Sequence, residues 1–478
     1  MILGYFGACF IALVTIAIFH FIRKWRNPTC INGRLPPGSM GLPLIGETIQ
    51  FLIPSKSMDV PSFISKRIKK YGPVFRTSLV GRPVVVSSDP DFNHYILQQE
   101  GRLVEFWYMD SFAKLCGQMD DGLPVTAFGL IHKYIRNLIL NHFGPEVLKE
   151  KLLPELEELW VRALQNWKAC DCVEVKQSTS AMMFDLTAKA LFGYEPDKSG
   201  EDMGKNLTNF LEGVMSVPLN VPGTAFHRCM QGQKKLLKLV NNVIQERRAH
   251  PEKRRGDFLD QILDDMKHQT FLTNNSVPII TFGLLLGTVE TVSSTITLTI
   301  KLLIEHPLVV EELMREHEEI LNRRENREAR ITWDEYKSMT FTMQVIQESL
   351  RLGNIAPGIL RRAIGDIEVN GYTIPKGWTI FSVPVAIHLN PETYKDPLSF
   401  NPWRWKDLGF SATQKNFTPF GGGSRQCAGA EFSKLLLALC IHELVTKYRW
   451  TKVKGGEIVR SPALTFGNGY YIKVTDKF

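Results

Sequence analysis

Hydrophobic and polar positions separate the start of the chain from everything that follows. Residues 1–22 are almost entirely apolar, with His20 as the one strongly polar exception, and Arg23, Lys24 and Arg26 follow at once. About 20 apolar residues are enough to span a bilayer as a helix, and a positive flank belongs on the cytosolic side. A cleaved signal peptide is the alternative, but its positive charges precede the apolar run. The pattern therefore predicts a retained transmembrane anchor at 1–22.

The next stretch, residues 23–43, is basic and rich in proline, and it includes the sequence LPPGSMGLP. Proline restricts the backbone and removes hydrogen-bond donors, so this stretch predicts a stiff, non-helical linker. Residues 44–478 contain no internal repeat and no long Gly/Ser linker. We therefore expect one large domain after the linker, in the cytosol.

Within that domain, apolar positions recur mainly at helical spacing between about residues 90 and 355. Alternating runs at 74–80 and 83–86 predict a hairpin around Gly81-Arg82, and residues 366–375 predict a second hairpin with Asn-Gly at its turn. Residues 377–381 are a further candidate strand. Many helices with a small, segregated sheet indicate a mostly α protein of the α+β class.

The helical pattern from Pro278 to His306 is unusually rich in Thr and Ser, and Glu290 is its one acid before Glu305. A second transmembrane helix is the alternative, but a carboxylate at mid-membrane costs about 2.5–3.5 kcal/mol. The hydroxyl groups also argue against lipid contact. We expect a central buried helix whose Glu290 and Thr291 face an internal cavity.

Composition narrows the setting without naming a function. The chain has 57 basic and 49 acidic side chains, a net charge of +8, and 44% hydrophobic residues. This modest surplus suits an acidic partner or an anionic membrane surface, and we find no nucleic-acid motif. The eight cysteines include no C-x-x-C pair, which argues against structural zinc and favours a reducing compartment.

Candidate chemistry is concentrated in residues 420–429, FGGGSRQCAG. Three consecutive glycines let the backbone turn tightly and pass close to a flat ligand. An apolar helical pattern begins at Ala428, so Cys427 is expected at a helix N-terminus, where N–H groups and the helix dipole favour an anionic sulfur. Arg425 is placed to pair with a carboxylate of the same ligand. The arrangement predicts a thiolate ligand for iron, with an inert buried cysteine as the alternative.

These residues fit F-x-x-G-x-R-x-C-x-G, which resembles the haem-binding signature of the cytochrome P450 superfamily. The resemblance implies haem b (iron protoporphyrin IX) as cofactor and Cys427 as its metal ligand. It also implies that Phe420, Gly421 and Gly429 contact the haem. The implied fold is that of a cytochrome P450: a large helical domain with a small β region, preceded by a transmembrane helix.

Residues 287–291, GTVET, resemble the distal-helix motif A/G-G-x-D/E-T of that superfamily. Thr288 stands where glycine is usual. The resemblance implies catalytic roles for Glu290 and Thr291, because a carboxyl group relays protons from outside while a hydroxyl donates a hydrogen bond to dioxygen.

Glu348 and Arg351 match the E-x-x-R of the superfamily, and Arg404 matches its F-x-P-x-R. By resemblance these three residues form a buried network that supports the cysteine loop, a structural role. The sequence TWDE at 332–335 predicts a capping box at the start of the helix that carries Glu348.

Haem propionates need cations, and by resemblance Arg425 and Arg361 serve them. Arg136 matches the arginine of the W-x-x-x-R helix, and His132 replaces its tryptophan. The expected substrate pocket, also by family position, is lined by several segments. These are the 105–128 loop, the 205–224 region, residues 283–291, residues 355–359 and residues 464–466.

Segments such as LPPGSMGLPLIGE at 35–47 resemble the plant clan that oxidises steroids and triterpenoids, and GLIHKYIR at 129–136 resembles a family acting on cucurbitane triterpenoids and sterols. The resemblance implies a monooxygenase that takes O2, and electrons from NADPH through cytochrome P450 reductase, at the endoplasmic reticulum membrane. Hydroxylation and oxidative cleavage both remain open. The alternatives are a haem hydroperoxide isomerase that works without reductase and a non-catalytic haem-binding protein.

Overall fold

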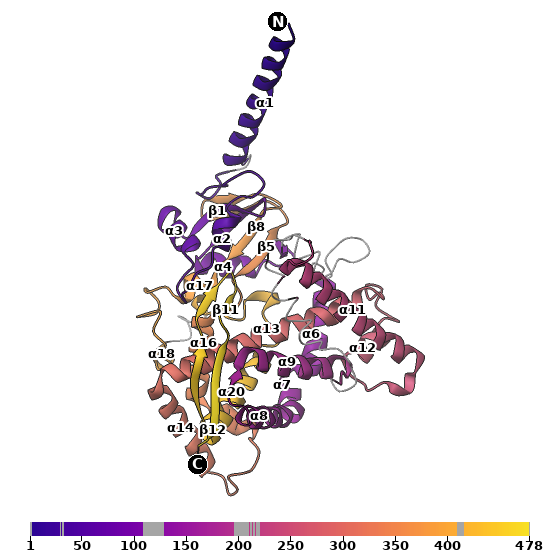
Figure 1. The fold of residues 1–478 in the computed structure, drawn as a ribbon, viewed down its shortest axis with the longest axis vertical. Coiled ribbons are helices and arrows are strands. Elements are labelled where there is room, and N and C mark those ends of the chain that lie inside the picture. Colours follow the sequence, from indigo (N-terminus) through magenta and orange to yellow (C-terminus); the bar gives the residue numbers. More distant parts are fainter. Residues whose placement is uncertain are drawn as a thin grey trace.

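The computed structural model describes residues 2–28, 30, 33–108, 129–195, 210, 213, 216, 220–408 and 415–477, and for residues 2–9 the backbone alone. Figure 1 shows a helical body with a smaller β region at one end, from which the N-terminal helix projects. The predicted class, mostly α with a segregated sheet, is confirmed.

Helices make up most of the described chain. They are α1 (Ile2–Arg26), α2 (Thr48–Leu52), α3 (Ser62–Tyr71), α4 (Pro90–Leu97), α6 (Gly129–Phe143), α7 (Pro145–Val147), α8 (Leu153–Lys168), α9 (Val175–Phe192), α11 (Ala225–Ala249), α12 (Phe258–Asp265), α13 (Ser276–Glu305), α14 (Pro307–Asn322), α15 (Trp333–Ser338), α16 (Thr340–Gly353), α17 (Pro384–His388), α18 (Arg404–Asp407) and α20 (Ala430–Lys447). Short π or 3-10 turns are η2 (Leu148–Leu152), η4 (Pro251–Lys253) and η5 (Gly423–Arg425).

The strands form small sheets. They are β1 (Val74–Leu79), β2 (Arg82–Ser87), β3 (Val104–Phe106), β4 (Val173–Glu174), β5 (Ile359–Ala363), β6 (Ile367–Val369), β7 (Tyr372–Ile374), β8 (Thr379–Ser382), β9 (Tyr448–Gly455), β10 (Ile458–Arg460), β11 (Leu464–Phe466) and β12 (Tyr470–Asp476). The largest sheet has the order β1-β2-β8-β5-β3, with β2 and β8 parallel and its other neighbours antiparallel. This sheet brings β3 and β5 side by side near the cysteine loop.

Both predicted hairpins are present, and one turn is shifted. β6 and β7 join at Asn370 and Gly371, which both have positive φ as a type I′ turn requires. β1 and β2 join at Val80 and Gly81, not at Gly81-Arg82, because Arg82 already pairs with Leu79. Val80 has a φ of 52°, a value that a β-branched residue rarely adopts.

The predicted buried helix is α13, which crosses the centre of the body (Figure 1). Among the residues whose side chains the structure describes, it alone has the length and hydropathy of a membrane span, but 56% of its apolar window is buried within the protein. Its hydroxyls donate back along the helix, as Thr281 does to the Val277 carbonyl and Ser293 to the Val289 carbonyl. These bonds satisfy polar groups in a core position, so α13 is a core helix.

The helix that carries Glu348 begins later than predicted. The capping box at Thr332 is present, with Glu335 as its reciprocal partner, but it starts the short α15. Met339, with ψ 67°, interrupts the helix, and α16 follows with Glu348 and Arg351.

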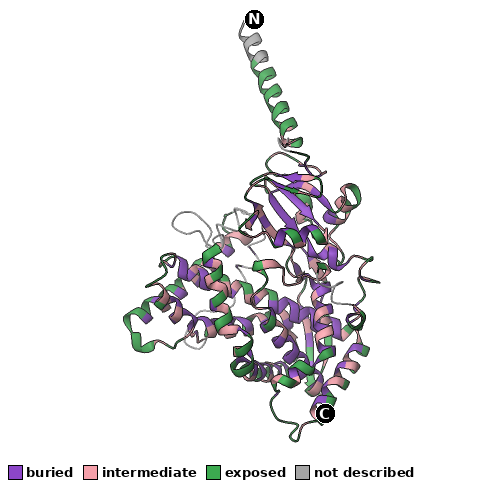
Figure 2. Cartoon of the chain, turned by 180° about the vertical axis from the view of Figure 1, so that it is seen from behind, coloured by how far each residue is buried: buried purple, intermediate pink, exposed green. Residues whose placement is uncertain are grey.

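Helix α1 projects from the body, and its large apolar side chains from Phe10 to Phe21 are exposed (Figure 2).

Candidate active site

The cysteine loop owes its path to glycine. Gly421 and Gly423 have φ values of 74° and 66°, and a Cβ on Gly423 would lie 2.0 Å from the carbonyl oxygen of Leu97. The backbone N–H of Cys427 donates to the Phe420 carbonyl at 2.9 Å, which closes the loop. These constraints hold the loop against α4. The following helix, α20, begins at Ala430, three residues later than Cys427 rather than next to it.

The Cys427 side chain is exposed, yet burial by surrounding protein raises the pKa of its thiol. A side chain with both properties lies on a concave surface, where solvent reaches it but dense protein surrounds it. The backbone N–H of Gly429 and the charge of Arg136 act in the opposite direction and favour the thiolate. Burial is the largest effect, so the predicted stabilisation by the helix N-terminus does not by itself produce a thiolate.

One face of the buried helix α13 is open. Gly283, Gly287 and Thr291, spaced four residues apart, are exposed, and a Cβ on either glycine would meet nothing within 4 Å. The Thr291 hydroxyl donates to the Gly287 carbonyl at 2.7 Å. Residues four apart share a helix face, so these three positions form a strip with room for another molecule.

Glu290 does not share that strip. Its carboxylate accepts from Lys176 Nζ on α9 at 2.6 Å and from the Ser294 hydroxyl at 3.3 Å. The expectation that Glu290 and Thr291 face one cavity is therefore wrong for Glu290, which is tied to the neighbouring helix. Lys176 was missed because its partner lies 114 residues away and no local pattern connects them.

Arg361 and Arg425 meet at a buried carboxylate that the sequence did not indicate. Glu100 Oε1 accepts from Arg425 Nε at 2.9 Å, and Glu100 Oε2 lies 2.8 Å from Arg361 Nε. Both guanidinium groups also lie over the ring of Phe106. Burial lowers the pKa of both arginines, while Glu100 raises it.

His132 and Arg136, from α6, belong to the same cluster. Burial, followed by the charges of Arg425, Arg136 and Arg361, lowers the pKa of His132 to about 4. Arg136 Nη1 donates to the Gln426 carbonyl at 2.5 Å, next to Cys427. The structure thus brings together the four side chains that the sequence singled out as cations or donors.

Comparison with known proteins identifies the family to which the chain belongs. A family model described as Cytochrome P450 matches residues 36–469. The chain belongs to the cytochrome P450 family.

Similar proteins cover nearly the whole chain. It is 48% identical to the beta-amyrin 16-alpha-hydroxylase CYP87D16 of Maesa lanceolata, over 98% of this chain and 99% of that protein. It is also 48% identical to the cucurbitadienol 11-hydroxylase of Siraitia grosvenorii, over 96% of each. A solved structure of retinoic acid bound cyanobacterial CYP120A1 matches with a TM-score of 0.80 and 26% identity, covering 93% of this chain and all of that one.

Membership makes this P450 a haem-thiolate monooxygenase that uses haem, dioxygen and a redox partner. The residues present fit haem. A solvent-reachable sulfur lies in a concave site, and an open glycine strip runs along α13. Arg361 Nε and Glu100 Oε2, although 2.8 Å apart, have no well-angled hydrogen bond to any described residue. Of these two atoms only Arg361 Nε is a donor, and this donor in a positively charged cluster suits the carboxylate of a ligand.

The predicted support for the cysteine loop is also present in this P450. Glu348 accepts from Arg351 through two bonds of 2.8 Å, and from Arg404 Nε at 2.9 Å. Arg351 donates to the His388 carbonyl, and His388 Nε2 accepts from the Thr418 N–H at 2.9 Å, two residues before Phe420. The network therefore reaches the cysteine loop through His388, a link that the sequence did not reveal.

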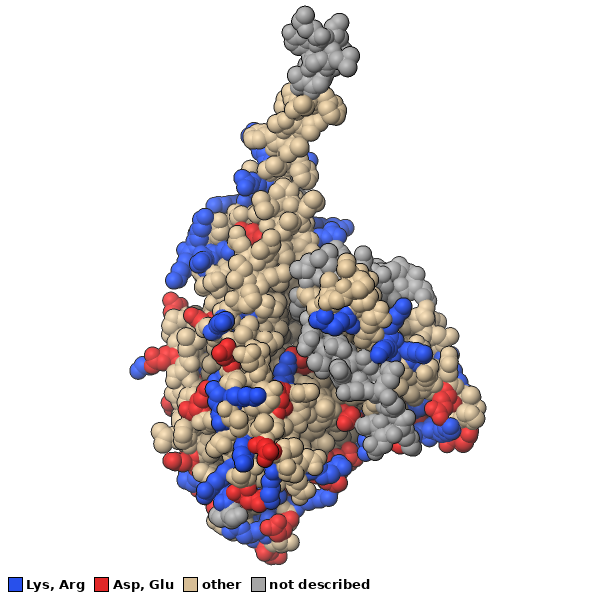
Figure 3. Space-filling model, viewed as in Figure 1, with Lys and Arg blue, Asp and Glu red and all other residues tan. Residues whose placement is uncertain are grey.

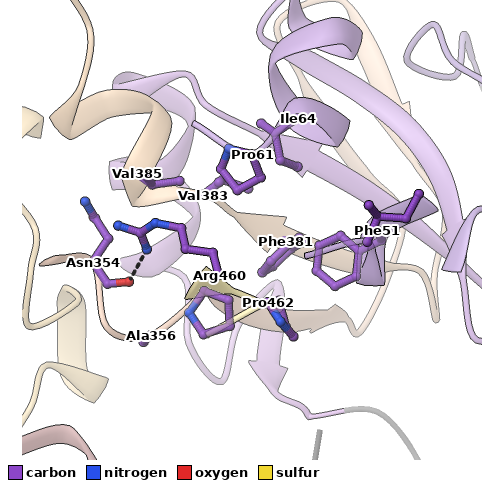
Figure 4. A pocket seen from close by; sticks show the side chains of 12 residues that line it. Phe51, Pro61, Ile64, Asn354, Ala356, Phe381, Val383, Val385, Arg460 and Pro462 are labelled. Atoms are coloured by element: carbon purple, nitrogen blue, oxygen red, sulfur yellow. Dashed lines mark hydrogen bonds between the residues drawn. The ribbon is translucent and has the colours of Figure 1, made fainter. Parts of the chain in front are cut away.

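Two pockets among the described residues of this P450 lie near the site. One, of about 20 Å³, lies between α2, α3 and the β10–β11 hairpin (Figure 4). It holds about one water molecule, far less than a sterol. Its lining includes Ala356, within the predicted segment 355–359. The second, of about 210 Å³, borders the cysteine loop at Gly421 and Gln426. Most of the predicted 105–128 and 205–224 lining lies outside the described residues.

Arg460, in the wall of the smaller pocket, is a structural cation. It is 3% exposed and donates to the carbonyls of Leu352 and Gly353. It also donates to the Asn354 carbonyl, the bond drawn in Figure 4. These carbonyls end α16, where a positive charge offsets the helix dipole. Burial lowers the pKa of Arg460 to about 10.

Proposed function

We propose that this P450 hydroxylates or oxidatively cleaves a triterpenoid or sterol, with electrons delivered from NADPH by cytochrome P450 reductase. The observation that carries the substrate class is 48% identity, over nearly full length, to two enzymes named as hydroxylases of beta-amyrin and cucurbitadienol. The open strip of Gly283, Gly287 and Thr291 supports it, because a rigid hydrocarbon needs space without polar contacts.

Haem, when bound, supplies the oxidation of an unactivated C–H bond with dioxygen and electrons. In this proposal Cys427 is its metal ligand and Phe420, Gly421 and Gly429 shape the loop around it. His132, Arg136, Arg361 and Arg425 hold its propionates. The cluster geometry around Glu100 supports that assignment.

In this proposal Glu290 and Thr291 transfer protons to the open strip of α13. The Thr291 hydroxyl is exposed on the open strip, and its single proton must leave the Gly287 carbonyl before it is donated to a bound ligand. Glu290 binds Lys176 on its outer side, so protons reach the helix through that ion pair and pass to Thr291. Lys176 therefore joins the proton path as a positioning residue.

The proposed setting is the endoplasmic reticulum membrane, with residues 1–22 as a single-pass anchor, 23–43 as linker and 44–478 as the catalytic domain. α1 continues to Arg26, so the helix extends into the basic part of the linker. Leu44 and Val80 are exposed at strained turns, each with positive φ, and the two turns are in contact at Gly81. Figure 3 shows Lys and Arg side chains on the surface near the base of the projecting helix. The last turn of α3 carries Lys69 and Lys70. Apolar tips with nearby cations suit a lipid surface.

The test is metabolite profiling of yeast that expresses the chain with a reductase, supplied in turn with beta-amyrin, cucurbitadienol and cholesterol. We expect a product 16 mass units heavier with one of them, accompanied by NADPH consumption in isolated membranes. Conversion of fatty-acid hydroperoxides without reductase would instead support the isomerase alternative, and no turnover of any kind would support a haem carrier.

Cys427→Ser tests the axial ligand in the same membranes. The ferrous carbon monoxide complex should lose its red-shifted Soret band, because serine does not provide the thiolate. Survival of the band would show that another residue binds the iron.

Thr291→Ala tests the proton path. We expect the substrate to bind normally while electrons are diverted to hydrogen peroxide, so the ratio of product to NADPH falls severalfold. Lys176→Met should slow turnover with a smaller loss of coupling, because Glu290 remains. Unchanged coupling in Thr291→Ala would remove that hydroxyl from the mechanism.

A further inference from the structure

Glu100 joins four segments around the proposed propionate site. It lies in the turn after α4, and its Oε1 accepts from the Phe106 N–H of β3 at 3.0 Å. The same oxygen binds Arg425 in η5 of the cysteine loop, and Oε2 contacts Arg361 in β5. One carboxylate therefore holds both arginines in place relative to the cysteine loop.

The two arginines need such a partner. Their side chains are 3% and 6% exposed, and that of Glu100 is 10% exposed. The charge of Arg361 lowers the pKa of Arg425, which shows that the two guanidinium groups oppose each other. Burying two like charges side by side is costly without a counter-ion.

The charges of the cluster also match those of the ligand. Arg136, Arg361 and Arg425 supply three positive charges, His132 is neutral near pH 7, and Glu100 supplies one negative charge. Two positive charges remain, which equal the two negative charges of the haem propionates. Without Glu100 the cluster would exceed the propionates by one charge.

We infer that Glu100 is a built-in counter-ion that positions Arg361 and Arg425 and sets the balance between the ferric and ferrous states of the haem. This inference rests on the proposed haem site. A negative charge near the iron stabilises the ferric state, which carries one more positive charge than the ferrous state. Low dielectric around these buried groups makes the effect large.

Glu100→Gln tests the inference because it keeps the shape and removes the charge. We expect the reduction equilibrium to move towards the ferrous state by about tenfold, which is about 59 mV for a one-electron couple. The measurement is a spectroelectrochemical titration of the purified holoprotein. Glu105→Gln is the matched control, since Glu105 lies on β3 next to Phe106 and binds Arg362 at 2.6 Å, but its side chain is 30% exposed. Its midpoint potential should stay at the wild-type value.

Glu100→Asp distinguishes the effect of the negative charge from the effect of side-chain length. It keeps the charge but shortens the side chain, so the midpoint should stay near wild type while haem transfer to apomyoglobin becomes severalfold faster. This variant also provides the measurement if Glu100→Gln yields no holoprotein. An unchanged midpoint in Glu100→Gln, an equal shift in Glu105→Gln, or a shifted midpoint in Glu100→Asp would each overturn the inference.

The carbon monoxide spectrum of the wild type separates this inference from the proposed function. A wild-type protein without the thiolate Soret band would refute the haem site itself. A normal band in wild type and Glu100→Gln, with equal midpoints, would refute only the role of Glu100.

Discussion

Two buried clusters among the described residues of this P450 each combine one glutamate with two arginines. They differ in how many of their polar atoms form hydrogen bonds. In the first, Glu348 binds Arg351 and Arg404 beneath the cysteine loop. In the second, Glu100 binds Arg361 and Arg425 beside that loop. Both place one negative and two positive charges out of water, so composition alone does not tell their roles apart.

The difference lies in the bonds around each cluster. Glu348 is fully buried and accepts additional bonds from the Asn401 N–H and the Trp405 indole, both at 3.0 Å. Arg351 donates to three backbone carbonyls as well, including that of Pro397 at 2.7 Å. In the Glu100 cluster, by contrast, Arg361 Nε and Glu100 Oε2 lack a well-angled bond to the described residues. A saturated cluster holds a fold together, and a cluster with remaining capacity suits a ligand.

The largest expected effect is that of Glu348→Gln, which would leave two buried guanidinium groups without their counter-ion. Removing one partner of a buried ion pair costs about 3–5 kcal/mol, a large part of the about 5–15 kcal/mol that stabilises a typical protein. We expect little folded protein, measured by soluble yield and by thermal melting followed with circular dichroism.

The control is Glu312→Gln, whose partner Arg315 is 61% exposed on the surface of α14. It should cost at most about 1 kcal/mol. Equal melting temperatures for Glu348→Gln and wild type would contradict a structural role for the first cluster.

The next largest effect is expected when an arginine of each cluster is replaced by lysine. In the first cluster the substitution should lower the stability of the fold, and in the second it should weaken the binding of haem. Arg404→Lys keeps the charge but loses bonds to backbone carbonyls such as that of Lys395 at 2.7 Å, so we expect a loss of about 1–3 kcal/mol. Arg425→Lys should cost less stability but release haem faster. Denaturant titration and haem transfer measure the two effects. The comparison fails if Arg404→Lys releases haem faster than Arg425→Lys does.

Resemblance to the superfamily predicted all three members of the first cluster but only the two arginines of the second. Glu348 and Arg351 are three residues apart on one helix, which a spacing pattern captures. Glu100 and Arg425 are 325 residues apart, and they meet because β3 pairs with β5 beside the cysteine loop. No periodicity in one sequence encodes that meeting, so Glu100 was missed while both of its arginines were identified by resemblance.

The inability of local patterns to reveal contacts between distant elements also explains the other differences between the predicted and the observed structure. The α13 helix, the two hairpins and the glycine loop follow from residues that are neighbours in the chain. Lys176 and His388 act through partners in other elements. The break at Met339 carries no Pro or Gly signal; its side chain is fully buried, which points to tertiary packing as the cause.

Acid should weaken the first cluster at its link to the cysteine loop. Burial, and then the charge of Arg351, lower the pKa of His388 to about 3 from 6.5. Between about pH 3 and pH 6.5, His388 therefore binds a proton in the unfolded chain but not in the folded chain. The free energy of unfolding falls as the pH falls below 6.5. We expect His388 to contribute up to about 1.4 kcal/mol per pH unit in this window, measured by unfolding at pH 7.5 and pH 5.5.

His388→Gln should reduce that slope, because glutamine does not titrate. His250→Gln is the control, since His250 is exposed on the surface. An unchanged slope in His388→Gln would show that acid acts elsewhere, for example on the buried His317 and His442, whose pKa values are also lowered by burial.

The smallest loss of stability should come from Trp405→Phe. Its size tests whether the first cluster remains stable after it loses one hydrogen bond. The indole of Trp405 donates to Glu348 Oε2, while its ring packs on Phe417 with centroids 4.4 Å apart and ring planes tilted by 56°. Phenylalanine keeps the ring contact and loses one neutral donor, which costs about 1 kcal/mol. Since Glu348 retains four other hydrogen bonds, from Arg351, Arg404 and the Asn401 N–H, no charge is left without a partner. Trp403→Phe, at a ring that is 40% exposed, gives the baseline for trimming an indole. A loss as large as that of Glu348→Gln would mean that the cluster depends on every bond it makes, and the contrast with the Glu100 cluster would then lie in charge alone.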